Sequence, residues 1–153
     1  MCVLELKIPP GVVALGAGAL MWAVASMGPS FDFPLPARGL VGAGCFASGV
    51  ALAAAGVTSF RRAKTTWNPL KPETASALVT TGIYTRTRNP MYLGVLFVLL
   101  GWACILANAL AVLVLPGVVV FLNRFQIEPE ERALAARFGR EFAAYRTRVR
   151  RWL

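Results

Sequence analysis

The residues best suited to chemistry in this chain lie in two short polar stretches, each at the edge of an apolar run. The first, "GIYTRTRNPMYLG", covers residues 82–94 and places two arginines, an asparagine, a proline and two tyrosines before a long apolar segment. The second, "NRFQIEPEE", covers residues 123–131 and follows the next apolar segment. A membrane anchor needs only a basic flank, so this polar detail indicates more than anchoring.

If the apolar residues between the two stretches form an antiparallel helical hairpin, the stretches meet at one end of it. Facing carboxylates and arginines can bind a charged, water-soluble cofactor there and still admit a lipid-like substrate from the side. A structural interpretation is also open, in which the arginines anchor to anionic lipid, the tyrosines lie at the interface and the glutamates favour a helix N-terminus. The corresponding non-enzymatic alternative is a four-helix membrane accessory protein, which binds no cofactor.

Composition favours an all-α integral membrane protein. Of the 153 residues 57% are hydrophobic and only 15% are charged, against about 25% charged in a soluble domain. The net charge is +9, which in so apolar a chain predicts the lipid bilayer as partner and no nucleic acid. The chain has no histidine, which excludes a Ser-His-Asp or Cys-His triad, and its three widely spaced cysteines predict neither a disulfide framework nor a zinc site.

Four uncharged segments predict about four transmembrane helices, at residues 8–27, 39–60, 91–107 and 109–122. The last two are separated by Asn108 and predict a tight hairpin, while the alternative is one long bent helix broken near Pro116. Residues 61–90 and the C-terminal tail are rich in arginine and lysine, so the positive-inside rule predicts that both are cytoplasmic. With two helices on each side of the loop, both termini are then expected in the cytoplasm, in a multi-pass protein of a bacterial-type inner membrane.

We therefore predict a single membrane domain over residues 1–153. It comprises two N-terminal transmembrane helices (1–60), a cytoplasmic loop (61–90), a helical hairpin (91–123) and a cytoplasmic amphipathic helix (124–153). Small residues crowd the second helix, which allows close helix packing and permits a homodimer. In the last segment one helix face is expected to carry five apolar residues: Leu134, Phe138, Phe142, Tyr145 and Val149.

The stretch "LVTTGIYTRTRNPMYLG", the apolar hairpin and "EERALAARFGREFAAYRTRV" together resemble the integral-membrane methyltransferases related to isoprenylcysteine carboxyl methyltransferase, with phospholipid methyltransferases as more distant members. The resemblance covers about residues 76–152, and its paired pattern is specific where either half alone is weak. It implies S-adenosylmethionine as cofactor, held without a Rossmann fold. Membrane sterol reductases are a related alternative, but the chain has only two helices before the motif half.

The resemblance also implies roles for individual residues. The expected cofactor-binding residues are Leu78, Val79, Tyr84, Arg88, Asn89, Pro90, Tyr92, Glu130 and Glu131. Among these, Glu130 is the expected partner of the cofactor's amino group, because a carboxylate facing an ammonium is a strong contact. The expected catalytic residues are Arg124, Tyr92 and Glu128. For a neutral acceptor, Glu128, Glu130 or Tyr92 could act as a base. The expected substrate-binding residues are Asn68, Arg124 and Gln126.

Two departures from the family pattern bear on the methyl acceptor. The family's histidine is Asn89 here, and Gln126 stands where related enzymes place a carboxylate-binding arginine, with Arg124 two residues earlier. A neutral amide does not replace a bidentate guanidinium, so we expect poor methylation of prenylcysteine carboxylates. The expected acceptor is small or lipid-like and apolar; the alternatives are a phospholipid or amine N-methyltransferase and a thiol S-methyltransferase.

Overall fold

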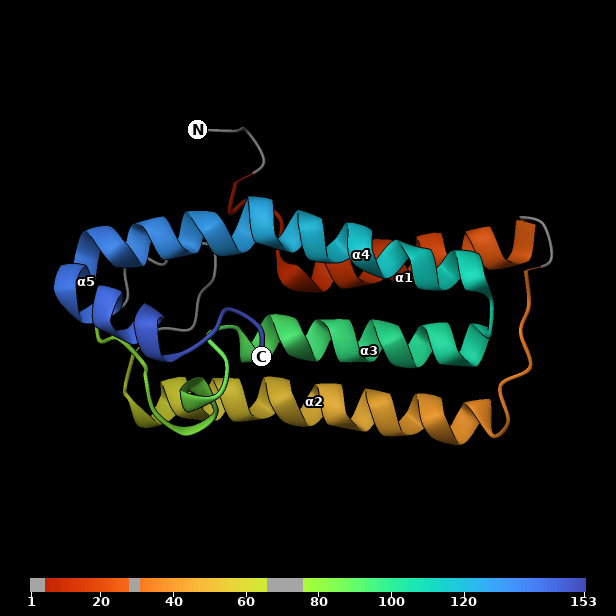
Figure 1. Cartoon of the computed structure of the whole chain (residues 1–153), viewed down its shortest axis with the longest axis horizontal. Coiled ribbons are helices and arrows are strands. Elements are labelled where there is room, and N and C mark those ends of the chain that lie inside the picture. Colours follow the sequence, from red (N-terminus) through yellow and green to blue (C-terminus); the bar gives the residue numbers. More distant parts are fainter. Residues whose placement is uncertain (1–4, 28–30, 66–75) are drawn as a thin grey trace.

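In a computed structural model the helices lie side by side along one direction, with the polar connections at the two ends (Figure 1). It describes residues 5–27, 31–65 and 76–153. In chain order the elements are α1 (Pro10–Met27), α2 (Arg38–Arg62), the 3-10 turn η2 (Gly82–Thr85), α3 (Pro90–Leu106), α4 (Ala109–Leu122), the π-helical turn η3 (Asn123–Ile127) and α5 (Glu128–Arg148). Across the described ranges there is no strand, only an isolated bridge between Asp32 and Asn108. The all-helical prediction is confirmed.

The helices are those of a membrane protein. Three helical runs, α1, α2 and the continuous run Ala109–Arg148, are long and apolar enough to cross a membrane, and the 17-residue α3 is a shorter apolar helix. At 1.5 Å per residue α3 is about 26 Å long, close to the roughly 30 Å of a bilayer's hydrocarbon core. Large apolar side chains point outward, among them Leu15, Leu40 and Leu113.

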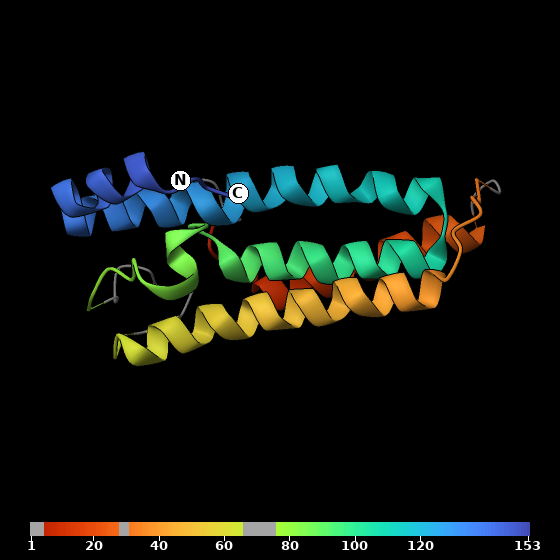
Figure 2. The ribbon, with the colours of Figure 1, turned by 60° about the horizontal axis from the view of Figure 1, so that its bottom comes forward.

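The polar ends of the helices meet at one end of the bundle. The beginning of α1, the end of α2, the beginning of α3 and the end of α4 all lie there, together with α5 and the C-terminus (Figure 1, Figure 2). This arrangement follows from four helices that alternate in direction. It brings residues from both ends of the chain next to the two polar stretches of the sequence.

The predicted hairpin is present, and its turn is built by two residues. Ala107 adopts a left-handed conformation (φ 50°) that ends α3, and the side chain of Asn108 accepts hydrogen bonds from the backbone N–H groups of Leu110 and Ala111 at the start of α4. An asparagine cap supplies the acceptor that the first turn of a helix lacks. Pro116 lies inside α4 without ending it, so the alternative of one long helix broken at Pro116 is wrong.

The small residues of α2 pack against small residues of α3. Gly42 and Gly49 are seven residues apart on α2, and Gly94 and Gly101 have the same spacing on α3. A Cβ atom added at Gly49 would lie 2.6 Å from the carbonyl oxygen of Gly94, and one added at Gly101 would lie 2.6 Å from that of Gly42. The small residues of α2 therefore allow close packing against α3 of the same chain. The homodimer stays a prediction.

The amphipathic helix differs from the prediction in two ways. It is continuous with α4 through the π-helical turn η3, and it bends sharply at Gly139, where φ is 47° and ψ is −114°. Positive φ favours glycine because it has no Cβ atom. After the bend the chain runs back toward the start of α3 (Figure 1). The helix over residues 134–149 is therefore bent, which the apolar pattern does not indicate.

Despite the bend, all five residues of the predicted apolar face contribute to the same small core. Phe142, Tyr145 and Val149 are buried in it with Val79 and Tyr84, and Leu134 and Phe138 pack against them. The doubled-back helix therefore covers the loop that precedes α3. This packing fixes the position of the first polar stretch relative to α5.

Candidate functional site

The two polar stretches are joined directly by one hydrogen bond. Tyr92 lies in the first turn of α3, with its ring in the main core beside Leu122 and Ile127. Its hydroxyl donates a hydrogen bond of 3.1 Å to the carboxylate of Glu130 on α5. Pro90 occupies the first turn of α3, where its missing N–H costs no helical hydrogen bond. The hairpin thus brings together the two stretches that the sequence separates by about 40 residues.

The neighbouring carboxylate, Glu131, is held by two arginines. Arg88 Nη2 lies 2.7 Å from one carboxylate oxygen of Glu131, and Arg151 Nη2 lies 2.8 Å from the other. Burial would raise the pKa of Glu131, but the hydrogen bonds and charges of Arg151 and Arg88 outweigh it and lower that pKa below its ordinary value. Glu131 is therefore an anion whose charge is already compensated.

Glu130 has the opposite electrostatic environment. Burial raises its pKa to about 7; the hydrogen bond from Tyr92 acts against this shift, and the negative charge of Glu131 adds to it. No arginine or lysine of the described chain forms an ion pair with Glu130. Of the two adjacent glutamates, Glu131 is an anion whose charge the arginines compensate. Glu130 has no such partner, so a cation bound nearby would stabilise its ionised form.

The polar residues before α3 hold the C-terminal tail. The backbone N–H of Arg88 donates to the carbonyl oxygen of Arg150 at 3.0 Å. The side-chain Nη1 of Arg88 donates to the carbonyl oxygen of Val149 at 2.8 Å. The side-chain amide of Asn89 donates to the Arg151 carbonyl at 2.9 Å, and Thr87 donates to the same oxygen at 3.3 Å. Asn89, expected to bind the cofactor, therefore contacts the C-terminal tail, a contact that the sequence did not predict.

Aromatic residues of the small core pack beside these polar groups. The Tyr145 hydroxyl donates to the Tyr84 carbonyl oxygen at 2.8 Å, and the ring of Tyr84 meets that of Phe60 edge-on at 5.4 Å. Val79 is buried against the same rings and Leu78 packs beside it. Burial raises the pKa of the Tyr84 and Tyr145 hydroxyls, that of Tyr145 to about 12. Both tyrosines are therefore neutral at physiological pH.

The profile of the phospholipid methyltransferase family matches residues 37–141 of this chain. The chain belongs to the phospholipid methyltransferase family. A Haemophilus influenzae protein, described only as uncharacterized, is 47% identical to it over 66 residues, which cover 41% of this chain and 100% of that protein. No solved structure gives a significant match. Together with the apolar helices, the family makes this a membrane methyltransferase.

Three residues are expected to bind the acceptor, and the structure describes two of them, Gln126 and Arg124. Gln126 is fully buried, and its amide donates to the carbonyl oxygen of Ile8 at 2.9 Å. Arg124 has 54% of its side chain exposed and pairs loosely with Glu5 and Glu128, at 3.7 and 3.6 Å. Asn68 lies outside the described residues. The structure thus commits Gln126 to the segment that precedes α1.

Glu128, one of the three predicted bases, lies between two arginines. Besides Arg124 it lies 3.9 Å from Arg151, and 40% of its side chain is exposed. Its position links the acceptor residues to the Arg151–Glu131 pair. In the structure Glu128 therefore forms ion pairs with arginines, whereas Glu130 accepts a hydrogen bond from Tyr92.

Four contributors to the site escaped the sequence analysis. Glu5 is nearly buried and pairs with Arg132 at 2.8 Å, so it fastens the N-terminal segment to α5. Arg151 and Thr87 hold the C-terminal tail, and the Trp152 indole donates to Asn123 at 3.2 Å. A usable signal existed for Glu5, because it is the only acidic residue before α1. The contacts of residues 87–89 with the tail gave none, because they use backbone carbonyls of the tail.

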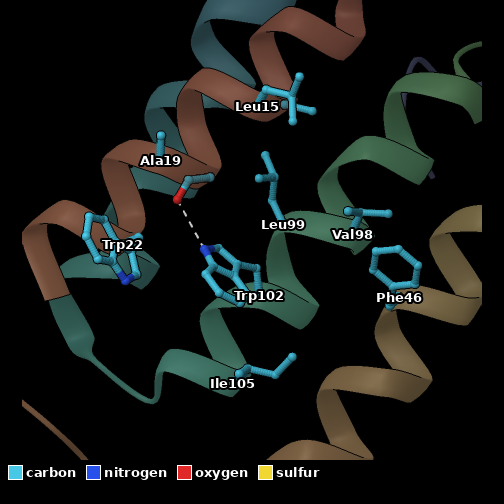
Figure 3. A pocket seen from close by; sticks show the side chains of 10 residues that line it. Leu15, Ala19, Trp22, Phe46, Val98, Leu99, Trp102 and Ile105 are labelled. Carbon is cyan, nitrogen blue, oxygen red and sulfur yellow. Dashed lines mark hydrogen bonds between the residues drawn. The ribbon is translucent and has the colours of Figure 1, made fainter. Parts of the chain in front are cut away.

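Two apolar grooves open on the outer sides of the helices. One, of about 410 Å³, lies among α1, α2 and α3, and one of its lining residues, Trp102, donates to the Gly18 carbonyl at 3.1 Å (Figure 3). The other, of about 460 Å³, runs between α1 and α4 from Leu20 to Ile8. Because Ile8 accepts the hydrogen bond of Gln126, the second groove ends next to the expected acceptor residues.

Proposed function

We propose that this protein transfers a methyl group from S-adenosylmethionine to a small or lipid-like apolar acceptor at the polar end of the bundle. The observation that carries the proposal is Glu130. It is a carboxylate without a cationic partner in the described chain, held by Tyr92 where the two family stretches meet. The methionine part of the cofactor carries an ammonium group, which such a carboxylate binds strongly.

The residues around Glu130 fit a zwitterionic ligand. Glu130 offers an acceptor for the ammonium group, and Arg88 offers a donor for the carboxylate, because its Nε is buried and has no hydrogen-bond partner among the described residues. The start of α3 at Pro90 adds backbone N–H groups that no helical carbonyl satisfies. In this proposal Leu78, Val79 and Tyr84 supply the apolar side of the same site.

The chemistry asks little more of the chain than positioning. The cofactor supplies a methyl group on a sulfonium, which an acceptor displaces in line. Holding both reactants in that geometry accounts for most of the rate gain. Tyr92 orients Glu130, and α5 covers the loop behind them. For an acceptor that must lose a proton, Glu128 is the best base of the three predicted, since the Tyr92 hydroxyl is a hydrogen-bond donor to Glu130 and Glu130 is reserved for the ammonium group.

The α1–α4 groove favours an acceptor with an apolar tail. Its lining residues are apolar, and it ends at Ile8 beside Gln126. An alkyl chain in this groove would direct its reactive end toward Arg124 and Glu128. Within this proposal a phospholipid head-group amine is supported by the family's description, and an apolar thiol is the alternative.

We expect labelled S-adenosylmethionine and a membrane lipid extract to yield a labelled, organic-soluble product. Gly117→Leu should reduce this transfer several-fold, because Gly117 lines the groove and a larger side chain there takes up groove space. A Cβ atom at this position meets nothing within 4 Å. Gly44→Leu is the matched control, since Gly44 is equally open but does not line the groove. No labelled product from the wild type would contradict the proposed function; equal transfer by both variants would contradict the groove.

The polar end is proposed to face the cytoplasm, with both termini. The exposed cations Arg61, Arg62, Lys64 and Arg86 gather there with the arginines of α5, and positive residues mark the cytoplasmic side. We expect a membrane-impermeant thiol reagent to label Cys2, or a cysteine placed at Lys64, only after the cells are opened. Labelling of either position in intact cells would contradict this orientation.

A further inference from the structure

We propose that Arg151 is a positioning residue of the cofactor site. By pairing with Glu131 it leaves the adjacent Glu130 as the carboxylate available to the cofactor's ammonium group. The inference rests on the proposed function. It assigns a role to the C-terminal tail, which lies beyond the last residue of the family match, residue 141.

The tail is docked by contacts that do not use the Arg151 guanidinium. Backbone carbonyls of Val149, Arg150 and Arg151 accept hydrogen bonds from Thr87, Arg88 and Asn89. The indole of Trp152 adds a hydrogen bond to Asn123. The tail can therefore remain in place when the charge of Arg151 is removed, which separates its electrostatic role from its structural one.

The guanidinium of Arg151 is directed at the glutamates of α5. Nη2 lies 2.8 Å from Glu131 Oε2, Nε lies 3.4 Å from Glu131 Oε1, and Nη1 lies 3.9 Å from Glu128. Glu131 thus receives two guanidinium groups, from Arg151 and from Arg88. Without Arg151, Arg88 still keeps Glu131 ionised, and the surroundings of Glu130 lose one positive charge.

The charged and titratable groups that face Glu130 come from three elements. Tyr92 of α3 donates a hydrogen bond to it, Tyr84 of η2 interacts with it electrostatically, and Glu131 is the next residue on α5. Both tyrosines are neutral at physiological pH when they face Glu130. Glu131 is therefore the charged group among these neighbours, and its pairing with Arg151 and Arg88 sets how strongly its negative charge acts on Glu130.

The test is the pH dependence of S-adenosylhomocysteine binding, measured by calorimetry on the whole protein in detergent. In the wild type the affinity should rise with pH through about 7, where Glu130 ionises, and then level off. In Arg151→Gln the midpoint should move upward by about one unit, because the loss of a nearby positive charge raises a carboxyl pKa. Binding should then be about tenfold weaker at pH 6 and nearly equal to the wild type at about pH 9.

Two further variants separate position from charge. Arg150→Gln removes the same charge one residue earlier, from an exposed side chain, and should leave the midpoint unchanged. Arg151→Lys keeps the charge and should restore the wild-type midpoint. Thermal melting of each variant reports whether the tail stays docked.

Several outcomes would overturn the inference. If Arg151→Gln binds with the same midpoint as Arg150→Gln, or weakens binding equally at every pH together with a lower melting temperature, Arg151 is only structural. If Arg151→Lys fails to restore the midpoint, charge is not its role. If the wild type binds S-adenosylhomocysteine at no pH, the proposed function and this inference both fail.

Discussion

Replacing Gly49 with alanine is expected to lower the free energy of unfolding by about 1–3 kcal/mol, the usual cost of overpacking a close contact. The new Cβ atom would lie 2.6 Å from the carbonyl oxygen of Gly94 and 2.9 Å from the backbone nitrogen of Val98. Both atoms belong to the backbone of α3, so no side-chain rotation relieves the contact. The two helices must move apart, and this also displaces the start of α3, which carries Tyr92.

Gly44→Ala provides the matched control on the same helix. A Cβ atom at Gly44 meets nothing within 4 Å, so this change should be neutral or stabilising by about 0.5–1 kcal/mol, because alanine is the better helix former. The stability of both variants can be measured by heating the protein in detergent and monitoring its unfolding by circular dichroism. Equal stability of the two variants would show that the close approach of α2 and α3 does not stabilise the bundle.

Adding Gly94→Ala to Gly49→Ala tests whether the two glycines act at one contact. Each added Cβ atom would lie 2.6 Å from the other residue's carbonyl oxygen. Once the helices have separated for the first methyl group, the second has room. The double variant should therefore lose less stability than the sum of the single losses.

The membrane helices and their hairpin could be predicted because their signals are local. A run without charge specifies a span, and Asn108 between two apolar runs specifies a turn with a cap. The small residues of α2 also predicted close packing, but their partner was missed. Gly94 and Gly101 show the same seven-residue spacing on α3, so comparing the spacings of the two helices would have identified the contact.

The course of α5 could not be predicted from periodicity. Residues 134–149 keep a helical apolar period because both halves of α5 pack on one small core, although the helix reverses at Gly139. The glycine was visible in "RFGRE", but a glycine within a helical pattern indicates neither the presence nor the direction of a bend. The contacts of residues 87–89 with the tail carry still less signal, because backbone carbonyls have no residue type.

Glu130 and Glu131 show how much of the site the sequence can predict. As a pair after Pro129, they suggested the first turn of a helix, where acidic residues favour the positive end of the dipole. In the structure α5 continues α4 through η3, and the N–H of Glu128 bonds the carbonyl of Asn123. No free helix end exists there, so the dipole does not explain these residues. Only the three-dimensional contacts separate the paired Glu131 from Glu130.

Glu130→Gln is therefore expected to weaken S-adenosylhomocysteine binding by about ten- to a hundredfold, the value of a charge-assisted contact of roughly 1.5–3 kcal/mol. Glutamine keeps the size of the side chain, and its amide oxygen still accepts the Tyr92 hydrogen bond. The loss should then come from the charge and not from the shape of the site. Melting temperatures close to the wild type would confirm that the fold is intact.

Glu128→Gln is the matched control, two residues away. Its ion pairs with Arg124 and Arg151 are long and partly exposed, so they are worth at most about 1 kcal/mol and binding should change by less than about fivefold. A second readout is pH. Protonation of Glu130 below about 7 removes the same charge as the substitution, so wild-type affinity should fall as the pH drops through 7, whereas Glu130→Gln should bind equally weakly on both sides. Equal, small losses in the two variants, with the wild-type pH dependence retained in Glu130→Gln, would exclude Glu130 as the partner of the cofactor's ammonium group.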